Sequence, residues 1–458
     1  MTGRMRTAAA VILTRGHGSE LEVFLALRSP ELRFFGGYWA CPGGVVEAVD
    51  AVGESTLGSA AERCAVRELE EEVALTLAPA RLETVGSITT PPFAPVRYAT
   101  SFFLARLRAG ESPRVSPGEL IDGEFARPAV WLDRWRQGSL RIVPPVLLVL
   151  ELLEDGDADG FLERARAETA ALEGGKLHPV RFSPGVFVAP LVTATKLPAT
   201  TTNTILVGEE RLFVVDPGAV AEPERERLHA KLDACLAAQR QLVGIVLTHH
   251  HPDHIGGVGA LQERYGLEVF AHAQTHARIT VAPGTARTLE DGSELDLGRA
   301  PDGSTPWTLR AYHTPGHAPG HLALRESRYG ALVAGDLVST VSTIVIDPPE
   351  GDLAQYLASL ERMANEDLGT IYPAHGPAHP DGRALLRQYL EHRRAREARL
   401  VAVLRSEPAT VSALVAMVYD DTAVEYHALA ARSLLAGLFK LEQEGRARRH
   451  SADHWSRP

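Results

Sequence analysis

His249, His251, Asp253 and His254 form the pattern H-x-H-x-D-H within six residues of the chain. Neutral imidazole nitrogens and carboxylate oxygens are the ligands that zinc and similar divalent ions prefer in proteins. The spacing lets several of these side chains face one centre if the loop that carries them is rigid. The stretch therefore predicts a metal site, and the alternative is a polar loop that is rich in histidine by chance.

The residues around this stretch predict the elements that hold it. An apolar run at 242–247 comes directly before it and is typical of a buried strand. Three glycines follow at Gly256, Gly257 and Gly259, and they let the main chain turn tightly. Because a strand that ends in a ligand loop is a rigid platform, we expect the metal site at the end of this strand.

Three more candidate ligands occur farther along the chain. His317 lies in a Pro-Gly turn, while Asp336 and His375 each follow an apolar run that must be buried. We therefore expect the site at the carboxyl edge of a sheet, where α/β proteins generally bind ligands. The elements predicted to precede it are strands at 184–192, 203–207 and 211–215 and a helix at 222–238.

A second candidate site lies near the amino terminus. Residues 59–75 have the pattern of a helix on which Glu68, Glu71 and Glu72 share one face. Such carboxylates repel one another unless a cation lies between them, and Mg²⁺ or Mn²⁺ suits their hard oxygen ligands. The alternative is a charged helix face in contact with solvent.

Length and composition restrict the class of protein. The chain has 458 residues, which exceeds one hydrophobic core and predicts several domains. Its formal net charge of −11 argues against a coat for nucleic acid over the whole chain, although not against a local basic patch. The three cysteines form no C-x-x-C pair, and no apolar segment is long enough to span a membrane. We therefore expect a cytoplasmic protein without a membrane partner, and we leave its oligomeric state open.

The candidate ligands together resemble the motifs of the metallo-β-lactamase superfamily, in the family's order. The resemblance implies an αββα sandwich over residues 176–380 with a dinuclear zinc site. It implies that the first zinc ion binds His249, His251 and His317, and that the second binds Asp253, His254 and His375, with Asp336 as the bridge.

The same resemblance implies roles for three further groups. Asp253 is expected to be catalytic, by steering a hydroxide that bridges the metals and by taking part in proton transfer. Asp216 is expected to orient a metal-bound histidine from outside the ligand set, and His321 is a candidate for a similar supporting role. His251 stands where iron-binding members usually have glutamate, which favours zinc.

Residues 1–175 resemble the Nudix family, which implies an α/β/α fold. The resemblance rests on the turn Pro42-Gly43-Gly44 and on the run from Arg67 to Glu72. It implies that Glu68, Glu71 and Glu72 bind Mg²⁺ or Mn²⁺, with Glu68 and Glu71 helping to cleave a diphosphate. The position of the family's first glutamate falls on Asp50 when counted from Gly44, or on Ser59 when counted back from Arg67 through Gly53.

Nudix members with an insertion after the Pro-Gly-Gly turn often hydrolyse coenzyme A derivatives. The run at 140–145 is similar to that branch, so a nucleotide or a coenzyme A derivative is a candidate ligand of this half. The alternative is a Nudix scaffold that has lost its activity.

Residues 381–458 are expected to form a winged helix. Helices are predicted at 384–404, 411–419 and 426–444, followed by the basic run 446–449. This tail has 13 Lys and Arg against 10 Asp and Glu, whereas the chain as a whole is acidic. It could contact nucleic acid or serve as a packing or dimerisation module.

The order of metallo-β-lactamase domain and winged helix resembles the β-lactamase-like endoribonuclease subfamily. Matching segments are 202–204, 215–218, 373–377 and 440–445. The leading expectation is therefore a zinc hydrolase that cleaves phosphodiesters in single-stranded RNA. The first alternative is a hydrolase of acyl-CoA, acyl-carrier or glyoxalase II-like thioesters, and the second is a regulatory protein that binds a nucleotide and nucleic acid.

Overall fold

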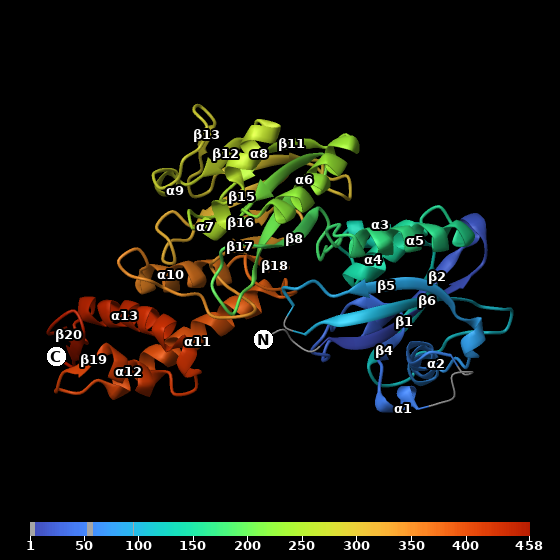
Figure 1. Ribbon diagram of the computed structural model, residues 1–458, viewed down its shortest axis with the longest axis horizontal. Helices are drawn as coiled ribbons and strands as arrows, with labels where there is room; N and C mark the ends of the chain where they lie inside the picture. Colours follow the sequence, from blue (N-terminus) through green and yellow to red (C-terminus); the bar gives the residue numbers. More distant parts are fainter. Residues whose placement is uncertain (1–4, 53–57, 95) are drawn as a thin grey trace. The chain divides into compact units, whose positions relative to one another are not determined.

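The computed structural model describes residues 5–52, 58–94 and 96–458. These fall into two compact units (Figure 1). The first comprises Met1–Ala189, Glu226–Cys235 and Pro301–Ser304, and the second comprises Pro190–Arg225, Leu236–Ala300 and Thr305–Pro458. The predicted domain boundaries at residues 175 and 380 remain a proposal.

The first unit is built on a mixed sheet with the strand order β3-β2-β1-β6-β5, in which β4 also pairs with β1 and β7 with β2. The central strand β1 runs parallel to β6 and antiparallel to β2. The strands are β1 (Arg6–Arg15), β2 (Glu22–Arg28), β3 (Trp39–Ala40), β4 (Gly43–Val45), β5 (Glu83–Thr89), β6 (Tyr98–Arg106) and β7 (Leu120–Ala126).

Helices cover both faces of this sheet because β1 is apolar on both sides. Val11 and Leu13 pack in one core with Leu69 of α2 (Ala60–Val73). Ile12 points to the other face, where Trp131 and Leu150 belong to a second core. Figure 1 shows α2 on one side of the sheet and α3 (Pro128–Arg136), α4 (Pro144–Leu152) and α5 (Ala158–Glu173) on the other. The predicted α/β/α layers are confirmed.

The second unit contains two sheets. Their strand orders are β13-β12-β11-β10-β9-β8 and β14-β15-β16-β17-β18. The first sheet comprises β8 (Val186–Val192), β9 (Thr201–Val207), β10 (Arg211–Val215), β11 (Gln241–Val246), β12 (Glu268–Ala271) and β13 (Ala286–Thr288). The second comprises β14 (Glu294–Gly298), β15 (Trp307–His313), β16 (Leu322–Glu326), β17 (Leu332–Gly335) and β18 (Ile371–Pro373).

Helices accompany both sheets, as the predicted αββα sandwich requires. Tyr356, Leu360 and Met363 of α10 share a core with Leu332 and Ile371 of the second sheet. The remaining helices of this region are α6 (Glu222–Ala237), α7 (Pro252–Ile255), α8 (Val258–Tyr265), α9 (Ala273–His276) and α10 (Leu353–Ala364).

The predicted ligand stretch follows a buried parallel strand. β11 pairs in parallel with β10 and with β12, and its last three residues are buried. β17 and β18 also run parallel to each other, and Asp336 and His375 come shortly after them. Because parallel strands end at the same edge of a sheet, these strand ends bring distant residues together.

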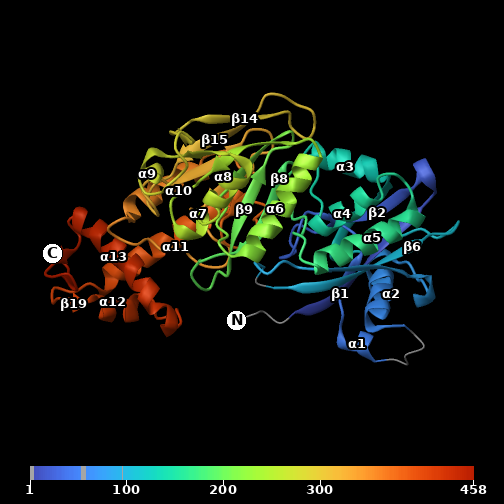
Figure 2. The same cartoon turned by 45° about the horizontal axis from the view of Figure 1, so that its top comes forward.

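The tail forms the predicted winged helix. It consists of α11 (Gly382–Val403), α12 (Val411–Val418), α13 (His427–Gln443) and a small sheet of β19 (Ala409–Thr410), β21 (His454–Ser456) and β20 (Arg448–Arg449). Its core contains Leu414, Leu438 and the fully buried Trp455. Figure 2 shows α12 and α13 beside the end of α11.

The sequence-based expectations on cysteines and membrane spans can also be compared with the structure. Cys41, Cys64 and Cys235 are buried and unpaired. Among the described residues, no helix has both the length and the apolar character that crossing a bilayer requires.

Candidate metal centre and carboxylate cluster

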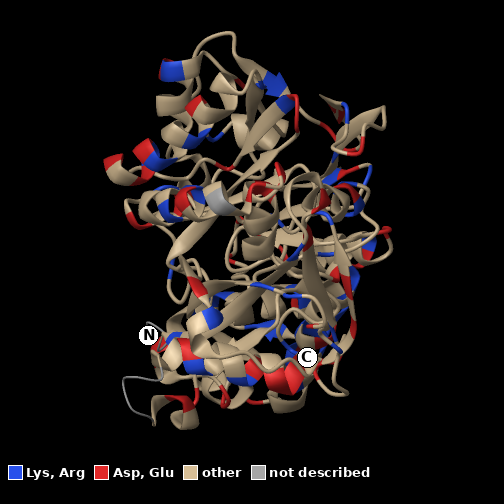
Figure 3. Ribbon diagram, turned by 90° about the vertical axis from the view of Figure 1, so that its right-hand side faces the viewer, with Lys and Arg blue, Asp and Glu red and all other residues tan. Residues whose placement is uncertain are grey.

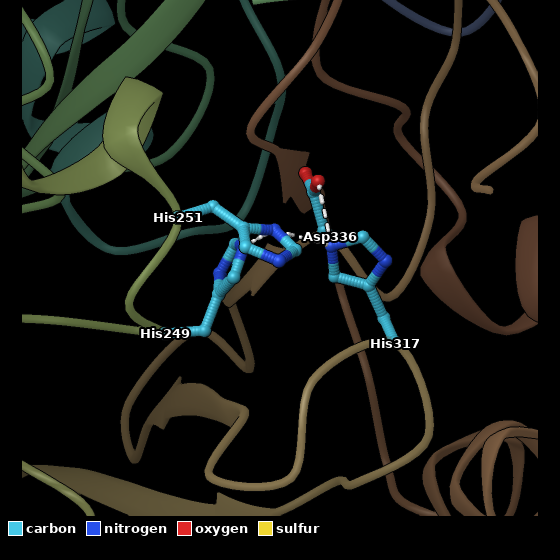
Figure 4. A group of neighbouring side chains, drawn as sticks. All are labelled: His249, His251, His317 and Asp336. Atoms are coloured by element: carbon cyan, nitrogen blue, oxygen red, sulfur yellow. Dashed lines mark hydrogen bonds and ion pairs between the residues drawn. The ribbon is translucent and has the colours of Figure 1, made fainter. Parts of the chain in front are cut away.

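Three histidine rings from two loops converge on one point (Figure 4). His249 Nε2 lies 2.9 Å from His251 Nδ1, and His317 Nε2 lies 3.0 Å from the same atom. One carboxylate oxygen of Asp336 lies 3.3 Å from His317 Nε2. The structure thus brings together four of the predicted ligands, with ligand atoms within 4.8 Å of one another.

The hydrogen bonds at the back of these rings show which nitrogens carry lone pairs. Thr248 Oγ1 donates to Asp216 and therefore accepts from His249 Nδ1, at 3.0 Å. His317 Nδ1 donates to the carbonyl oxygen of Val345 at 2.9 Å. Burial lowers the pKa of His249 well below its usual value and that of His251 to about 3, so both rings are neutral.

When a neutral ring carries its proton on the nitrogen that faces away from the site, its other nitrogen turns a lone pair toward the site. That arrangement repels unless a cation accepts the lone pairs, and imidazole nitrogens with a carboxylate suit zinc. The residues present therefore fit the metal that the sequence predicts.

The remaining predicted ligands, Asp253, His254 and His375, form a neighbouring group. His254 Nδ1 donates to Asp216 at 2.8 Å, and His375 Nδ1 donates to the carbonyl oxygen of Thr201 at 3.0 Å. The buried Nε2 of His254 has no hydrogen-bond partner. His375 Nε2 lies 3.5 Å from an oxygen of Asp253. Both rings direct Nε2 toward carboxylates, which fits a second cation.

Charge in this group also favours a cation. Burial lowers the pKa of His254, but the carboxylates of Asp216, Asp253 and Asp336 outweigh burial and raise it to about 10. A buried ring has this property only where negative charge is in excess. A bound cation supplies the same counter-charge without the proton.

Asp336 connects the two groups. Its two carboxylate oxygens lie 3.3 Å from His317 Nε2 and 3.3 Å from His375 Nε2. Its main-chain N–H donates to His321 Nε2 at 3.0 Å, and the opposite ring nitrogen of His321 bonds Thr314 at 2.8 Å. His321 thus holds the main chain of the connecting residue and does not face either group of ligands.

Asp216 is a strained residue behind the site. Its φ of +50° lies in the left-handed region that non-glycine residues rarely adopt. The carboxylate accepts from the amide of Thr248 at 2.8 Å and from its hydroxyl at 2.6 Å, besides His254. Strain retained at such a position is typical of a functional site, because the surrounding bonds fix it.

Asn203 holds the loop of His375, a role that sequence reasoning missed. Its buried side-chain amide donates to the carbonyl oxygens of Pro373 at 2.9 Å and Gly376 at 2.8 Å. Its main-chain N–H donates to Ala374 at 2.7 Å. The run Thr202-Asn203-Thr204 was noticeable in the sequence, but only the fold shows that it lies against residues 170 positions later.

Replacing Asn203 with alanine is expected to weaken zinc binding roughly tenfold, as loss of an outer hydrogen-bond partner does in other zinc sites. It leaves two buried carbonyl groups without their donor, which also costs roughly 1–3 kcal/mol of stability each. Chelator competition measures the first effect and urea unfolding the second. Unchanged zinc affinity in a destabilised variant would show that Asn203 supports only the fold.

Glu350 is another residue that sequence reasoning missed. It lies 2.9 Å from His250 Nε2, 3.7 Å from His251 Nε2 and 3.3 Å from Arg278 Nε. His250 Nε2 is therefore within hydrogen-bonding distance of this carboxylate. His272 accepts from the amide of Gln274 and stacks on His313 with ring centroids 4.2 Å apart.

In the Nudix-like unit, the structure decides between the two predicted positions of the first acidic residue. Asp50 is buried and accepts two hydrogen bonds from Arg67, both at 3.0 Å. Burial raises its pKa, but these bonds and the amide of Glu47 outweigh burial and lower it. Ser59 instead caps α2 by accepting from the amide of Glu62. Asp50 therefore stands at the family's glutamate, and Gly53 lies outside the described residues.

The three predicted Nudix ligands differ in their surroundings. Glu68 pairs with Arg67 at 2.8 Å, and the exposed Glu71 pairs with the same guanidinium at 2.9 Å. Glu72 is partly buried and accepts from the amide of Gly43 at 2.8 Å. Burial raises the pKa of both Glu68 and Glu72, and the charge of Glu119 raises each further.

The state of Glu72 gives a testable pH dependence. Burial raises its pKa from 4.5 to about 7, more than the Gly43 amide lowers it. Because the folded protein holds this proton more tightly than the unfolded chain, stability falls as the pH rises from about 4.5 to about 7. In chelator, Glu72→Gln is expected to stabilise the protein at pH 8 by roughly 1–2 kcal/mol and to have little effect at pH 4.

Urea unfolding at the two pH values measures this effect. Glu70→Gln is the matched control, since Glu70 is on the same helix and exposed to solvent. Equal effects of Glu72→Gln at both pH values would contradict the proposed burial of the charge.

Family models agree with this geometry. Residues 197–375 match the metallo-beta-lactamase superfamily, residues 410–455 the beta-lactamase associated winged helix domain, and residues 4–144 the NUDIX domain. The Beta-lactamase-like protein 2 homolog of Caenorhabditis elegans is 30% identical over 249 residues, which cover 53% of this chain and 79% of that relative. The chain belongs to the metallo-β-lactamase superfamily. Its Nudix and winged-helix resemblances are confirmed as well.

Two further similarities bear on enzyme class and fold. An atrochrysone carboxyl ACP thioesterase of Claviceps purpurea is 29% identical over 229 residues, 48% of this chain and 67% of that relative. A beta-lactamase domain protein from Burkholderia ambifaria has 22% identity and a TM-score of 0.53, covering 61% of this chain and 93% of that one, and it supports the fold alone. The metallo-β-lactamase and Nudix families are both hydrolase families, so the predicted hydrolase class is confirmed.

Proposed function

We propose that this metallo-β-lactamase member is a hydrolase with two zinc ions. His249, His251 and His317 bind one ion, Asp253, His254 and His375 bind the other, and Asp336 binds both. The convergence of imidazole nitrogens, with the rings of His249, His317 and His375 each fixed by a hydrogen bond on the side away from the site, is the observation that carries this proposal. When bound, such a pair of ions activates water and neutralises the charge that develops on the substrate.

The protein's own side chains then orient the histidine rings and transfer protons. Asp253 Oδ2 accepts a hydrogen bond from Thr202 at 3.3 Å, which fixes the carboxylate beside His375. A carboxylate in this position can accept a proton from water and return it to the leaving group. Asp216 and Thr248 hold His249 and His254 in the tautomers that leave Nε2 free.

For the substrate, we propose a thioester of coenzyme A or of an acyl-carrier protein. This was the first alternative to single-stranded RNA. The Claviceps relative is named as an acyl-carrier thioesterase, and the Nudix half resembles a branch that hydrolyses coenzyme A derivatives. Under this proposal, both halves of the chain can act on derivatives of coenzyme A.

The charges of the winged helix also favour a thioester over RNA. Arg432 of α13 pairs with Asp347, and Lys440 pairs with Glu397 and Glu444. Across the described ribbon, basic and acidic positions are interspersed (Figure 3). RNA binding depends on several Lys and Arg side chains that are free to contact phosphates. The exposed Arg448 and Arg449 of the wing keep RNA as the second candidate.

Purified protein with added zinc tests the proposal on acyl-CoA, on labelled single-stranded RNA and on ADP-ribose-type diphosphates. Thioester hydrolysis that disappears in His251→Ala is the expected result. RNA cleavage that disappears in the same variant, without thioester hydrolysis, would establish the second candidate. Thioester hydrolysis that persists in His251→Ala would refute the assignment to the metal centre.

For the Nudix half, we propose that Glu68, Glu71 and Glu72 bind Mg²⁺ or Mn²⁺, with Glu119 as a further ligand. Burial raises the pKa of Glu68 and Glu72, and the charge of Glu119 raises both further, so a divalent cation would relieve the repulsion. Glu68 and Glu71 are the proposed catalytic groups for cleaving a diphosphate, and a nucleotide or coenzyme A derivative is the proposed substrate.

A further inference from the structure

The segment 339–352 lies between the metal centre and the helices of the tail. On one side, the carbonyl oxygen of Val345 accepts from His317 Nδ1 at 2.9 Å. On the same side, Glu350 lies 3.7 Å from His251 Nε2. The segment therefore reaches the outer nitrogens of two proposed zinc ligands.

Two helices of the tail hold the other side of this segment. From α11, the buried hydroxyl of Tyr389 donates to Ser342 O at 2.7 Å, and the buried Arg393 donates to Ile344 O. From α13, Ser433 Oγ accepts from the amide of Ile346 at 3.3 Å.

An ion pair strengthens the contact with α13. Arg432 binds the carboxylate of Asp347, which lies two residues after Val345. In helix-turn-helix proteins the corresponding helix contacts nucleic acid. Here that helix directs Arg432 and Ser433 to a loop of the metal centre.

A third cation is the alternative explanation for part of this arrangement. His250, His251 and Glu350 have ligand atoms within 4.8 Å of one another. The Arg278 guanidinium, however, lies 3.3 Å from the same Glu350 oxygen that pairs with His250. A positive charge already bound to this carboxylate disfavours a metal ion, so Glu350 is better explained as the partner of Arg278 and His250 beside the ring of His251.

We infer that the winged-helix tail positions the metal ligands through the segment 339–352. By fixing the main chain on both sides of Val345, α11 and α13 place the carbonyl oxygen that sets the ring orientation and the tautomer of His317, which determines how its inner nitrogen meets the ion. Arg432 and Ser433 are thus positioning residues. The inference rests on the proposed zinc centre and gives the tail a role that requires no nucleic acid.

The full chain with Arg432→Ala and Ser433→Ala combined tests this inference. Arg399→Ala is the matched control, because Arg399 and Arg432 are both 48% exposed. Arg399 forms its ion pairs with Asp420 and Asp421, inside the tail. Zinc affinity is measured by chelator competition, and ligand geometry by the visible spectrum of the cobalt-substituted protein. Arg432→Lys keeps a cation beside Asp347 and serves as the rescue variant.

We expect the double variant to bind zinc roughly tenfold more weakly, with an altered cobalt spectrum. The control and the lysine variant are expected to match the wild type. A folded double variant with wild-type affinity and spectrum would overturn the inference. If the double variant does not fold, the single Ser433→Ala variant is measured by the same criteria. Failure of the wild type to bind zinc would instead refute the metal centre itself.

Discussion

Replacing Asp336 with alanine is expected to lower kcat/KM of the metal centre by roughly a thousandfold or more. Its carboxylate oxygens lie 3.3 Å from His317 Nε2 and 3.3 Å from His375 Nε2, so one side chain serves both proposed ions. Without it, the ions lose their shared ligand and the negative charge that holds them close together. Elemental analysis is expected to find less zinc per chain than in the wild type.

Asp291→Ala is the control for this change. Asp291 is a carboxylate of the same unit, 49% exposed, and it pairs with Arg362 away from the seven proposed ligands. We expect this variant to retain its zinc and its rate. Asp336→Ala with the zinc content and kcat/KM of the wild type would contradict the shared-ligand proposal.

The seven candidate ligands could be located from sequence because each belongs to a short local pattern. His249, His251, Asp253 and His254 are adjacent in the chain, and Asp336 and His375 each follow an apolar run. The rule that buried parallel strands end at a common edge then brings these patterns together without knowledge of side-chain contacts. The same local reasoning predicted α2 and the helices of the tail.

The groups that orient the ligands could not be located in this way. Asn203 contacts residues 170 positions away, and Glu350 is one acidic residue in a loop without periodicity. Their identity depends on which loops meet after folding, and a single sequence does not contain that information. The choice between Asp50 and Ser59 depended in the same way on which of the two side chains reaches Arg67.

The tail shows a similar difference between composition and structure. Its excess of basic residues left nucleic-acid contact open as a prediction, since counting charges does not show how they pair. In the structure, Arg396 and Arg399 pair with Asp421, while Lys440 pairs with Glu397 and Glu444. These pairs stabilise the tail internally, and Arg432 extends the same kind of bond to the metal-centre loop.

Replacing Glu68 with glutamine is expected to lower diphosphate hydrolysis by roughly a hundredfold or more, while leaving the metal-centre activity unchanged. Glu68 and Glu72 lie one turn apart on the same face of α2, so the change removes one negative charge where Mg²⁺ is proposed to bind. Steady-state rates on an ADP-ribose-type or coenzyme A substrate, measured over a series of Mg²⁺ concentrations, separate weaker metal binding from slower chemistry.

Glu70→Gln makes the same chemical change on the same helix, but on a side chain exposed to solvent. It is expected to keep the full rate, which makes the comparison specific to the clustered face. If Glu68→Gln and Glu70→Gln hydrolyse the diphosphate equally well, the carboxylate cluster is not the catalytic site. A third outcome is that the wild type hydrolyses no diphosphate, while Mg²⁺ stabilises the wild type but not the Glu68→Gln variant. The cluster would then bind a cation without catalysis, as expected of a Nudix scaffold that has lost its activity.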